Sequence, residues 1–100
     1  MQALPCIELN NEEQDLLKFL AFQVIKSGTE SNKFELPPTP KSANLNQIAA
    51  SFVTIYISGE LRGCIGAINA SEPLWLDVCS HSYSSAFEDN RFLPITEDEL

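Results

Sequence analysis

The segment from Arg62 to Gly66 carries the residues whose types and spacing could do chemistry. Side chains alternate along a β-strand, so Arg62, Cys64 and Gly66 would share one face. A guanidinium two residues from a thiol can stabilise the thiolate, and a glycine on that face leaves room for a ligand or another backbone to approach. The candidate binding residues are Arg62, Gly63, Cys64 and Gly66, with Cys64 also a weak candidate nucleophile. The alternative interpretation is structural, with Cys64 a small buried residue of a sheet and the glycines serving twist or bulges.

The length of a hairpin loop decides which neighbours Cys64 has. Residues 52–57 are β-branched and aromatic, a turn around Gly59 follows, and a second apolar run returns, which predicts a β-hairpin. An even number of loop residues would place Cys64 on the face of Val53, in a core setting. An odd number would place it beside Thr54, in a setting more typical of a site.

Residues outside this segment could also contribute chemistry. His81 follows Cys79 by two positions, but a Cys-x-His pair has neither zinc spacing nor a second ligand pair, so no metal site is predicted. A partly exposed structural histidine is favoured over a general base. Asp89 and Arg91 can form a local ion pair that fixes the exit of a helix, or the rim of a ligand site. Neither a Walker loop nor a dinucleotide glycine fingerprint occurs, and we expect no cofactor.

The first element that must position these residues is an amphipathic helix, predicted over Asn10–Ser27. Its first residue can cap it together with Glu13, and Gly28 can end it in the left-handed conformation. Phe19 and Phe22 lie outside its apolar stripe. Two aromatic residues there indicate contact on a second side of the helix.

The remaining elements complete an α+β pattern. Residues 29–46 are predicted to form a connector, because the cluster Pro37–Pro40 excludes a helix or a central strand. The same cluster has the spacing of a polyproline ligand, a less common use of such sequence. A second helix is predicted to start near Pro73, with Asp77 on its polar side. Thr96-x-x-Glu99 has the pattern of a further helix start.

Composition excludes some classes of function. The chain has 100 residues, with 6 Lys+Arg against 14 Asp+Glu and a formal net charge of -8. Nucleic acids and anionic membrane surfaces attract Lys and Arg, so direct binding to either is not expected. Three widely spaced cysteines, at positions 6, 64 and 79, indicate reduced thiols. The start of the chain has no leader pattern, and no apolar run approaches about 18 residues, so a soluble, cytoplasmic protein is expected.

Two blocks of sequence resemble the AMMECR domain family. The first is Phe52-Val53-Thr54 followed by Gly59-Glu60-Leu61-Arg62-Gly63-Cys64-Ile65-Gly66, and the second comprises Ala86-Phe87, Asp89, Arg91-Phe92, Pro94 and Thr96…Glu99-Leu100. The resemblance implies an α+β domain with helices on a sheet and a second lobe. It covers about the first half of that domain, so residues 1–100 are expected to be a partial AMMECR-type domain, truncated on the C-terminal side.

The resemblance also implies partners. Members of the family are often encoded beside, or fused to, Memo-like proteins and accompanied by radical-SAM proteins. A half-domain would leave a bare sheet edge, which favours self-association. The leading hypothesis is a ligand- or partner-binding module acting through the hairpin face of Arg62, Gly63, Cys64 and Gly66, with Asp89 and Arg91 at its rim. The second is a thiol-dependent enzyme, or an accessory of a Memo-like or radical-SAM modification system, and the third is a purely structural module.

Overall fold

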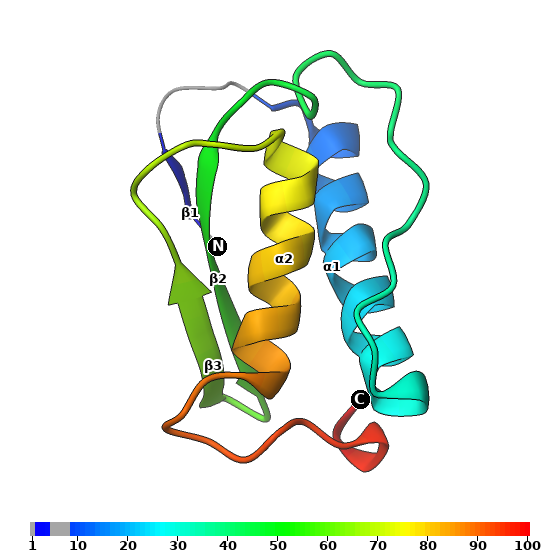
Figure 1. Cartoon of the computed structure of the whole chain (residues 1–100), viewed down its shortest axis with the longest axis vertical. Helices are drawn as coiled ribbons and strands as arrows, with labels where there is room; N and C mark the ends of the chain where they lie inside the picture. Colours follow the sequence, from blue (N-terminus) through cyan, green and yellow to red (C-terminus); the bar gives the residue numbers. More distant parts are fainter. Residues whose placement is uncertain (1, 5–8) are drawn as a thin grey trace.

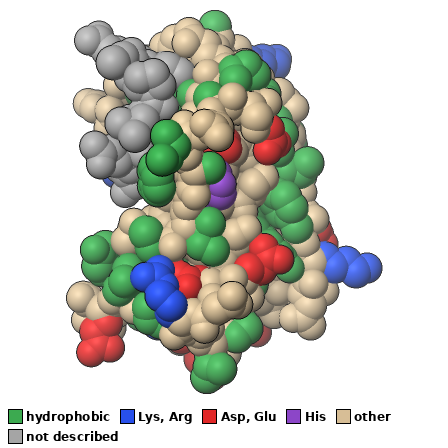
Figure 2. All heavy atoms as spheres, turned by 60° about the vertical axis from the view of Figure 1, so that its left-hand side comes forward, with side chains coloured by type: hydrophobic (Ala, Val, Ile, Leu, Met, Phe, Trp, Pro, Cys, Tyr) green, Lys and Arg blue, Asp and Glu red, His purple; other side chains and the backbone are tan. Residues whose placement is uncertain are grey.

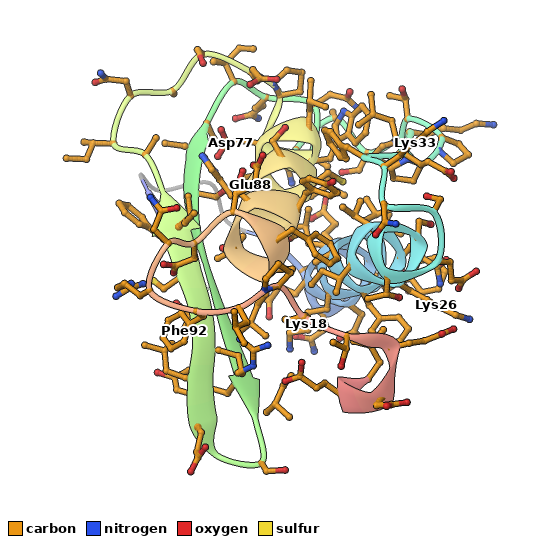
Figure 3. The ribbon with its side chains drawn as sticks, turned by 60° about the horizontal axis from the view of Figure 1, so that its bottom comes forward. Lys18, Lys26, Lys33, Asp77, Glu88 and Phe92 are labelled. Carbon is orange, nitrogen blue, oxygen red and sulfur yellow. The ribbon has the colours of Figure 1, made fainter. Side chains whose placement is uncertain are left out.

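The chain forms one antiparallel sheet covered on one face by two helices. The computed structural model describes residues 2–4 and 9–100. Its strands lie in the order β1-β2-β3, and both helices lie on the same side of the sheet (Figures 1 and 3). The fold is α+β, as predicted. The elements are β1 (Gln2–Leu4), α1 (Asn11–Ser31), β2 (Ala50–Ile57), β3 (Glu60–Gly66), α2 (Leu74–Phe87) and a 3-10 helix, η1 (Glu97–Glu99).

Helix α1 begins where the sequence predicts and ends later. Asn10 and Glu13 form a reciprocal capping box that satisfies backbone donors of the first turn. The prediction that Gly28 ends the helix is wrong, because the helix continues to Asn32, which takes the left-handed conformation with φ 58°. Gly28 has a packing role instead. A Cβ at this position would collide with the ring of Phe87, so the glycine permits the close approach of α1 and α2.

The core lies between the helices and the sheet. The connector between α1 and β2 contains no helix or long strand and runs back along α1 (Figure 1). Its Leu45 is fully buried. No helix in the described part of the chain is long and apolar enough to cross a bilayer. The main cluster comprises Leu17, Leu20, Val24, Leu45, Ala49, Val53, Leu74, Trp75, Val78 and Cys79, and a smaller one comprises Ile25, Ala86 and Ile95.

The register of the hairpin differs from what its loop length predicts. Ser58 and Gly59 form a two-residue loop with φ 52° and 81°, the pattern of a type I′ turn. This even loop would pair Cys64 with Val53. Instead the pairing shifts at Arg62, which has no partner on β2, and Cys64 lies opposite Thr54. A single-residue bulge therefore reverses the consequence of the loop length and turns Cys64 to the other face.

Contact with α2 occurs at the same part of β3. A Cβ on Gly63 would collide with the backbone carbonyl of Ser85, so α2 lies directly on the strand there. The Ser85 hydroxyl donates to the carbonyl of Val53 and accepts from the N–H of Ile65, each at 3.0 Å. One helical side chain thus joins the two strands next to the bulge.

This close approach predicts a large effect of a small substitution. Gly63→Ala should lower the free energy of unfolding by about 2 kcal/mol or more, because an added methyl group meets helix backbone that cannot turn away. Cys64→Ala is the matched control, since that position already carries a Cβ, and should change stability by less than about 1 kcal/mol. Urea unfolding measures both. Equal stability of Gly63→Ala and the wild type would contradict the contact.

Candidate functional site

Cys64 lies on the outer strand of the sheet, on the face turned away from the helices. Its partner Thr54 lies between Val53 and Ile55, which pack toward the helices, so Thr54 and Cys64 both face the other way. The Cys64 Sγ is 3.3 Å from the Thr54 Oγ1, and the residue is half-buried. The described thiols, Cys64 and Cys79, are both free, whereas Cys6 lies outside the described residues.

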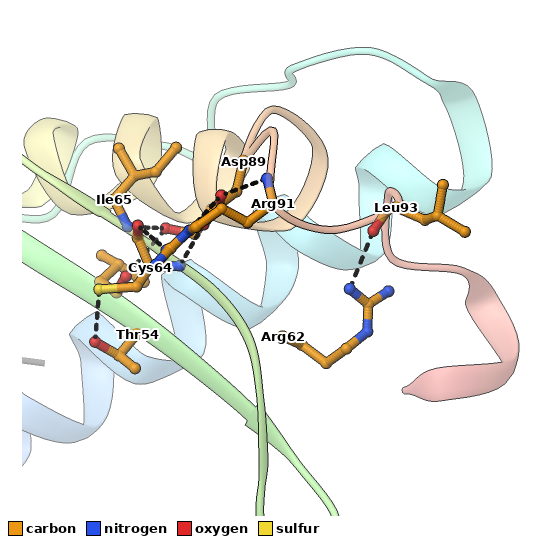
Figure 4. Close-up of polar contacts among 9 residues, drawn as sticks. Thr54, Arg62, Cys64, Ile65, Asp89, Arg91 and Leu93 are labelled. Carbon is orange, nitrogen blue, oxygen red and sulfur yellow. Dashed lines mark hydrogen bonds and ion pairs between the residues drawn. The ribbon is translucent and has the colours of Figure 1, made fainter.

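Asp89 and Arg91 bind the backbone of Cys64 at the open edge of β3 (Figure 4). The N–H of Cys64 donates to Asp89 Oδ2 at 3.0 Å, and Arg91 Nη2 donates to the Cys64 carbonyl at 3.2 Å. Arg91 also donates from Nε and Nη2 to the two carboxylate oxygens of Asp89, at 3.0 and 2.7 Å. We call this arrangement of Cys64, Asp89 and Arg91 the edge clamp. It gives hydrogen-bond partners to the N–H and the carbonyl of Cys64 at the edge of the sheet.

The two charged side chains of the edge clamp differ in their exposure to solvent. The Asp89 side chain is 6% exposed and that of Arg91 is 59% exposed. Hydrogen bonds from Arg91, and next the N–H of Cys64, hold the pKa of Asp89 well below its usual range. The pKa of Arg91 is raised, chiefly by Asp89 and to a smaller extent by Cys64. The guanidinium beside the thiol is therefore that of Arg91.

Arg62 is directed elsewhere. Its guanidinium donates to both carboxylate oxygens of Glu99, at 2.7 and 2.9 Å, and to the carbonyl of Leu93 at 3.0 Å. The hydrogen bonds from Arg62, and next the N–H of Thr96, lower the pKa of Glu99 to about 2. In Figure 4 Arg62 extends toward Leu93 and away from Cys64. The expected pairing of Arg62 with the thiol is not what the structure shows, because the bulge at Arg62 breaks the alternation on which it depended.

Two glycines of the motif serve packing. Gly63 is buried against Ser85 of α2. At Gly66, a Cβ would collide with the ring of Phe52 and with the carbonyl of Ser51. Of the two expectations for Gly66, the structure shows the approach of another backbone, since the Ser51 carbonyl and the ring of Phe52 occupy that space. Of the predicted site residues, the structure therefore brings together Cys64, Asp89 and Arg91.

Sequence analysis missed a second polar cluster. Asp77, expected on the polar side of α2, is 5% exposed. Its Oδ2 accepts from the Ser51 hydroxyl at 2.6 Å and lies 3.1 Å from Nδ1 of His81. Asp77 thereby fixes the imidazole and leaves its Nε2 unengaged by that carboxylate. The spacing of Asp77 and His81, four residues on a helix, was the available signal.

The positions of Ser51, Asp77 and His81 limit the chemistry that this cluster can carry out. The one histidine lies in a hollow of the surface in Figure 2. The Ser51 hydroxyl is fully buried and hydrogen-bonded to Asp77, so it is not placed as a nucleophile. Within residues 2–4 and 9–100, no group of three or more His, Cys, Asp or Glu side chains is arranged to hold a metal ion. The cluster therefore serves to orient His81.

Proteins of known sequence, and one of known structure, are similar to this chain. A protein of Saccharolobus islandicus (strain L.S.2.15 / Lassen #1) is 37% identical over 97 residues, covering 93% of this chain and 42% of the relative. A protein of Nanoarchaeum equitans is 34% identical over 82 residues, covering 81% and 45%. The crystal structure of an uncharacterised protein from Pyrococcus horikoshii superposes with a TM-score of 0.83 at 28% identity, covering 91% of this chain and 47% of that one.

The chain thus spans less than half the length of these relatives. The AMMECR1 family model matches residues 18–100. That match includes α1 from its third turn onward, the hairpin with Cys64, and the two residues that clamp it, Asp89 and Arg91. Because this match spans most of the chain, the chain belongs to the AMMECR1 family.

Proposed function

We propose that this chain is a partner-binding module that acts through the outward face of its hairpin. The surface consists of Thr54, Tyr56, Cys64 and Arg91, and we call it the hairpin surface. The observation that carries the proposal is the exposed guanidinium of Arg91, held rigid by Asp89 and by the backbone of Cys64. A fixed, exposed cation recognises an anionic group with little loss of side-chain entropy on binding.

Exposed aromatic surface on the same face of the hairpin supports a protein as the partner. Tyr56 is 66% exposed and shares the face of Thr54 and Cys64. Tyrosine and arginine are enriched among the residues that dominate protein interfaces. Figure 2 shows basic, acidic and hydrophobic side chains gathered on the sheet side of the molecule. With a net charge of -8, the chain is poorly suited to nucleic acid.

The partner we propose is a Memo-like protein, or the radical-SAM protein that accompanies it, contacting Arg91 through a carboxylate. Arg91→Ala and Tyr56→Ala should each weaken the complex with a purified Memo-like protein at least about tenfold, because each removes a contact at the centre of the hairpin surface. Isothermal titration calorimetry measures this affinity.

Controls separate binding from folding. Lys33→Ala removes an exposed cation just beyond α1, far from the hairpin surface, and should leave the affinity within about twofold. Arg91→Lys keeps the charge but loses the two-point hydrogen bonding to Asp89, so it should bind more weakly than the wild type. Wild-type affinity in Arg91→Ala, Tyr56→Ala and Cys64→Ser together would refute the proposal.

A thiol-dependent enzyme is the second candidate, favoured by the contact of the Cys64 thiol with the Thr54 hydroxyl and by the Arg91 guanidinium bound to the Cys64 carbonyl. Iodoacetamide should label Cys64 well before Cys79, since burial raises the pKa of the Cys79 thiol to about 11. Peptide mass spectrometry distinguishes the two sites. Rapid labelling of Cys64 at pH 6 would favour the enzyme, whereas labelling only at alkaline pH would count against it.

The integrity of the edge clamp should depend on pH. The pKa values of Asp89 and Glu99 are lowered in the folded state, so their stabilisation is complete above the unfolded value of about 4 and is lost as pH falls toward 2. Asp89→Asn should lower the melting temperature at pH 7, and its difference from the wild type should shrink progressively below about pH 4. Thermal melts from pH 2 to 7 test this. A constant difference across that range would show that Asp89 is not clamped as an anion.

A further inference from the structure

The outer edge of β3 continues past the edge clamp to Gly66. The N–H and carbonyl of Cys64 point out of this edge, where the side chains of the edge clamp bind them. Backbone groups of alternate residues on a strand point the same way, so those of Gly66 also point outward. The next residue, Ala67, fits this alternation, because its N–H points inward and donates to the Ser51 carbonyl of β2. No described residue forms a hydrogen bond with the outward N–H and carbonyl of Gly66.

The cation of the edge clamp lies on the side of Gly66. Along a strand, the N–H of each residue precedes its carbonyl. Asp89 binds the N–H of Cys64, and Arg91 binds the carbonyl of Cys64. Along the edge, the guanidinium therefore lies nearer to Gly66 than the carboxylate does. Nε and Nη2 of Arg91 are engaged, whereas no described residue accepts a hydrogen bond from its Nη1.

The edge clamp limits what can pair with this edge. Asp89 and Arg91 occupy the place at Cys64 where a neighbouring strand would bond. A strand that pairs with Gly66 must therefore end or turn away there. If it ends, it brings a terminal charge to Arg91, which is the ammonium of a parallel strand or the carboxylate of an antiparallel one. A guanidinium repels the first and binds the second.

We propose that this edge binds the C-terminal tail of the partner protein as a short antiparallel strand. The inference rests on the proposed function, and it specifies that the carboxylate contacting Arg91 is the terminal one. The last residue of the tail pairs with Gly66, so that its N–H donates to the Gly66 carbonyl and one carboxylate oxygen accepts from the Gly66 N–H. The other carboxylate oxygen accepts from Nη1 of Arg91.

The residue before the last one in the tail lies opposite Ala67, and its side chain points to the helix side of the sheet. At that level, Nδ1 of His81 lies 3.4 Å from the Ser51 hydroxyl and 3.1 Å from the Asp77 carboxylate. The Ser51 hydroxyl donates its own proton to Asp77, and a carboxylate can only accept. Nδ1 therefore carries the proton, and Nε2 of the neutral ring has a free lone pair. Because the imidazole lies in a surface hollow (Figure 2), a serine or threonine in the tail can donate to Nε2.

Calorimetric titration with the full chain separates this inference from the proposed function. The titrants are the Memo-like protein with its natural C-terminus and the same protein with a Gly-Ser extension. The extension should weaken binding at least about tenfold, because it moves the terminal carboxylate away from Arg91 and Gly66. Undiminished binding of the extended protein, together with weaker binding by Arg91→Ala, would overturn the inference and leave the proposed function standing.

The remaining results of this titration are also decisive. Undiminished binding by Arg91→Ala overturns the inference, because the terminal carboxylate then does not depend on the guanidinium. The radical-SAM protein is titrated in the same two forms. Binding by neither protein overturns both proposals.

A synthetic peptide with the last residues of the bound protein locates the contact on β3. The free acid should bind at least about tenfold more tightly than the C-terminal amide, because the amide lacks the charge that Arg91 recognises. The acid should also slow amide hydrogen exchange at Gly66 at least about tenfold. Exchange at Cys64, whose N–H already donates to Asp89, should change little. Equal affinity of the two peptides, or unprotected Gly66, overturns the inference.

A double-mutant cycle tests the contact with His81. Peptides with threonine or alanine at the position before the last are titrated against the wild type and His81→Ala. The wild type should prefer threonine about fivefold, and the variant should bind both peptides within about twofold. Each preference is measured within one protein, so a general loss of stability in the variant does not produce this result. The same preference in both proteins would overturn the contact with His81.

Discussion

The closeness of α2 to β3 determines the geometry of the rest of the structure. Gly63 lets the helix backbone rest on the strand, and the Ser85 hydroxyl from that helix joins β2 and β3. One residue before Gly63, Arg62 forms the bulge that sets the pairing of the rest of β3 with β2. The end of α2 then delivers Asp89 to the edge at Cys64. The edge clamp, the register of β3 on β2 and the position of α2 therefore depend on one another.

Local sequence patterns were sufficient to predict the secondary-structure elements, because each element depends on residues that are close in sequence. The capping box at Asn10, the two-residue turn at Gly59 and the capping pattern at Thr96 are all present as the sequence predicts. The error at Gly28 has a different origin. Glycine is favoured at helix ends for its conformation, but here it is required by the ring of Phe87, a contact between residues far apart in the chain.

The site was only partly predictable, for the same reason. Alternation along a strand placed Arg62 beside Cys64, but the pairing with β2 shifts at Arg62. The glycines of this segment indicated that a bulge could occur, whereas its position is set by the pairing with β2. Arg91, the guanidinium that does approach Cys64, is 27 residues away. Asp77 looked like a surface residue on the helical wheel, and its burial depends on Ser51 from a distant strand. Tertiary contacts decided each of these cases.

The hairpin surface depends on contacts that Cys64 makes on both of its sides. Thr54 of β2 directs its hydroxyl to the Cys64 thiol, and Asp89 and Arg91 hold the Cys64 backbone at the outer edge of β3. The ion pair with Asp89 also fixes the exposed guanidinium of Arg91 before any partner is present. Because these side chains are already ordered, a partner that binds them causes a smaller loss of conformational entropy, so the edge clamp matters for the proposed function as well as for the fold.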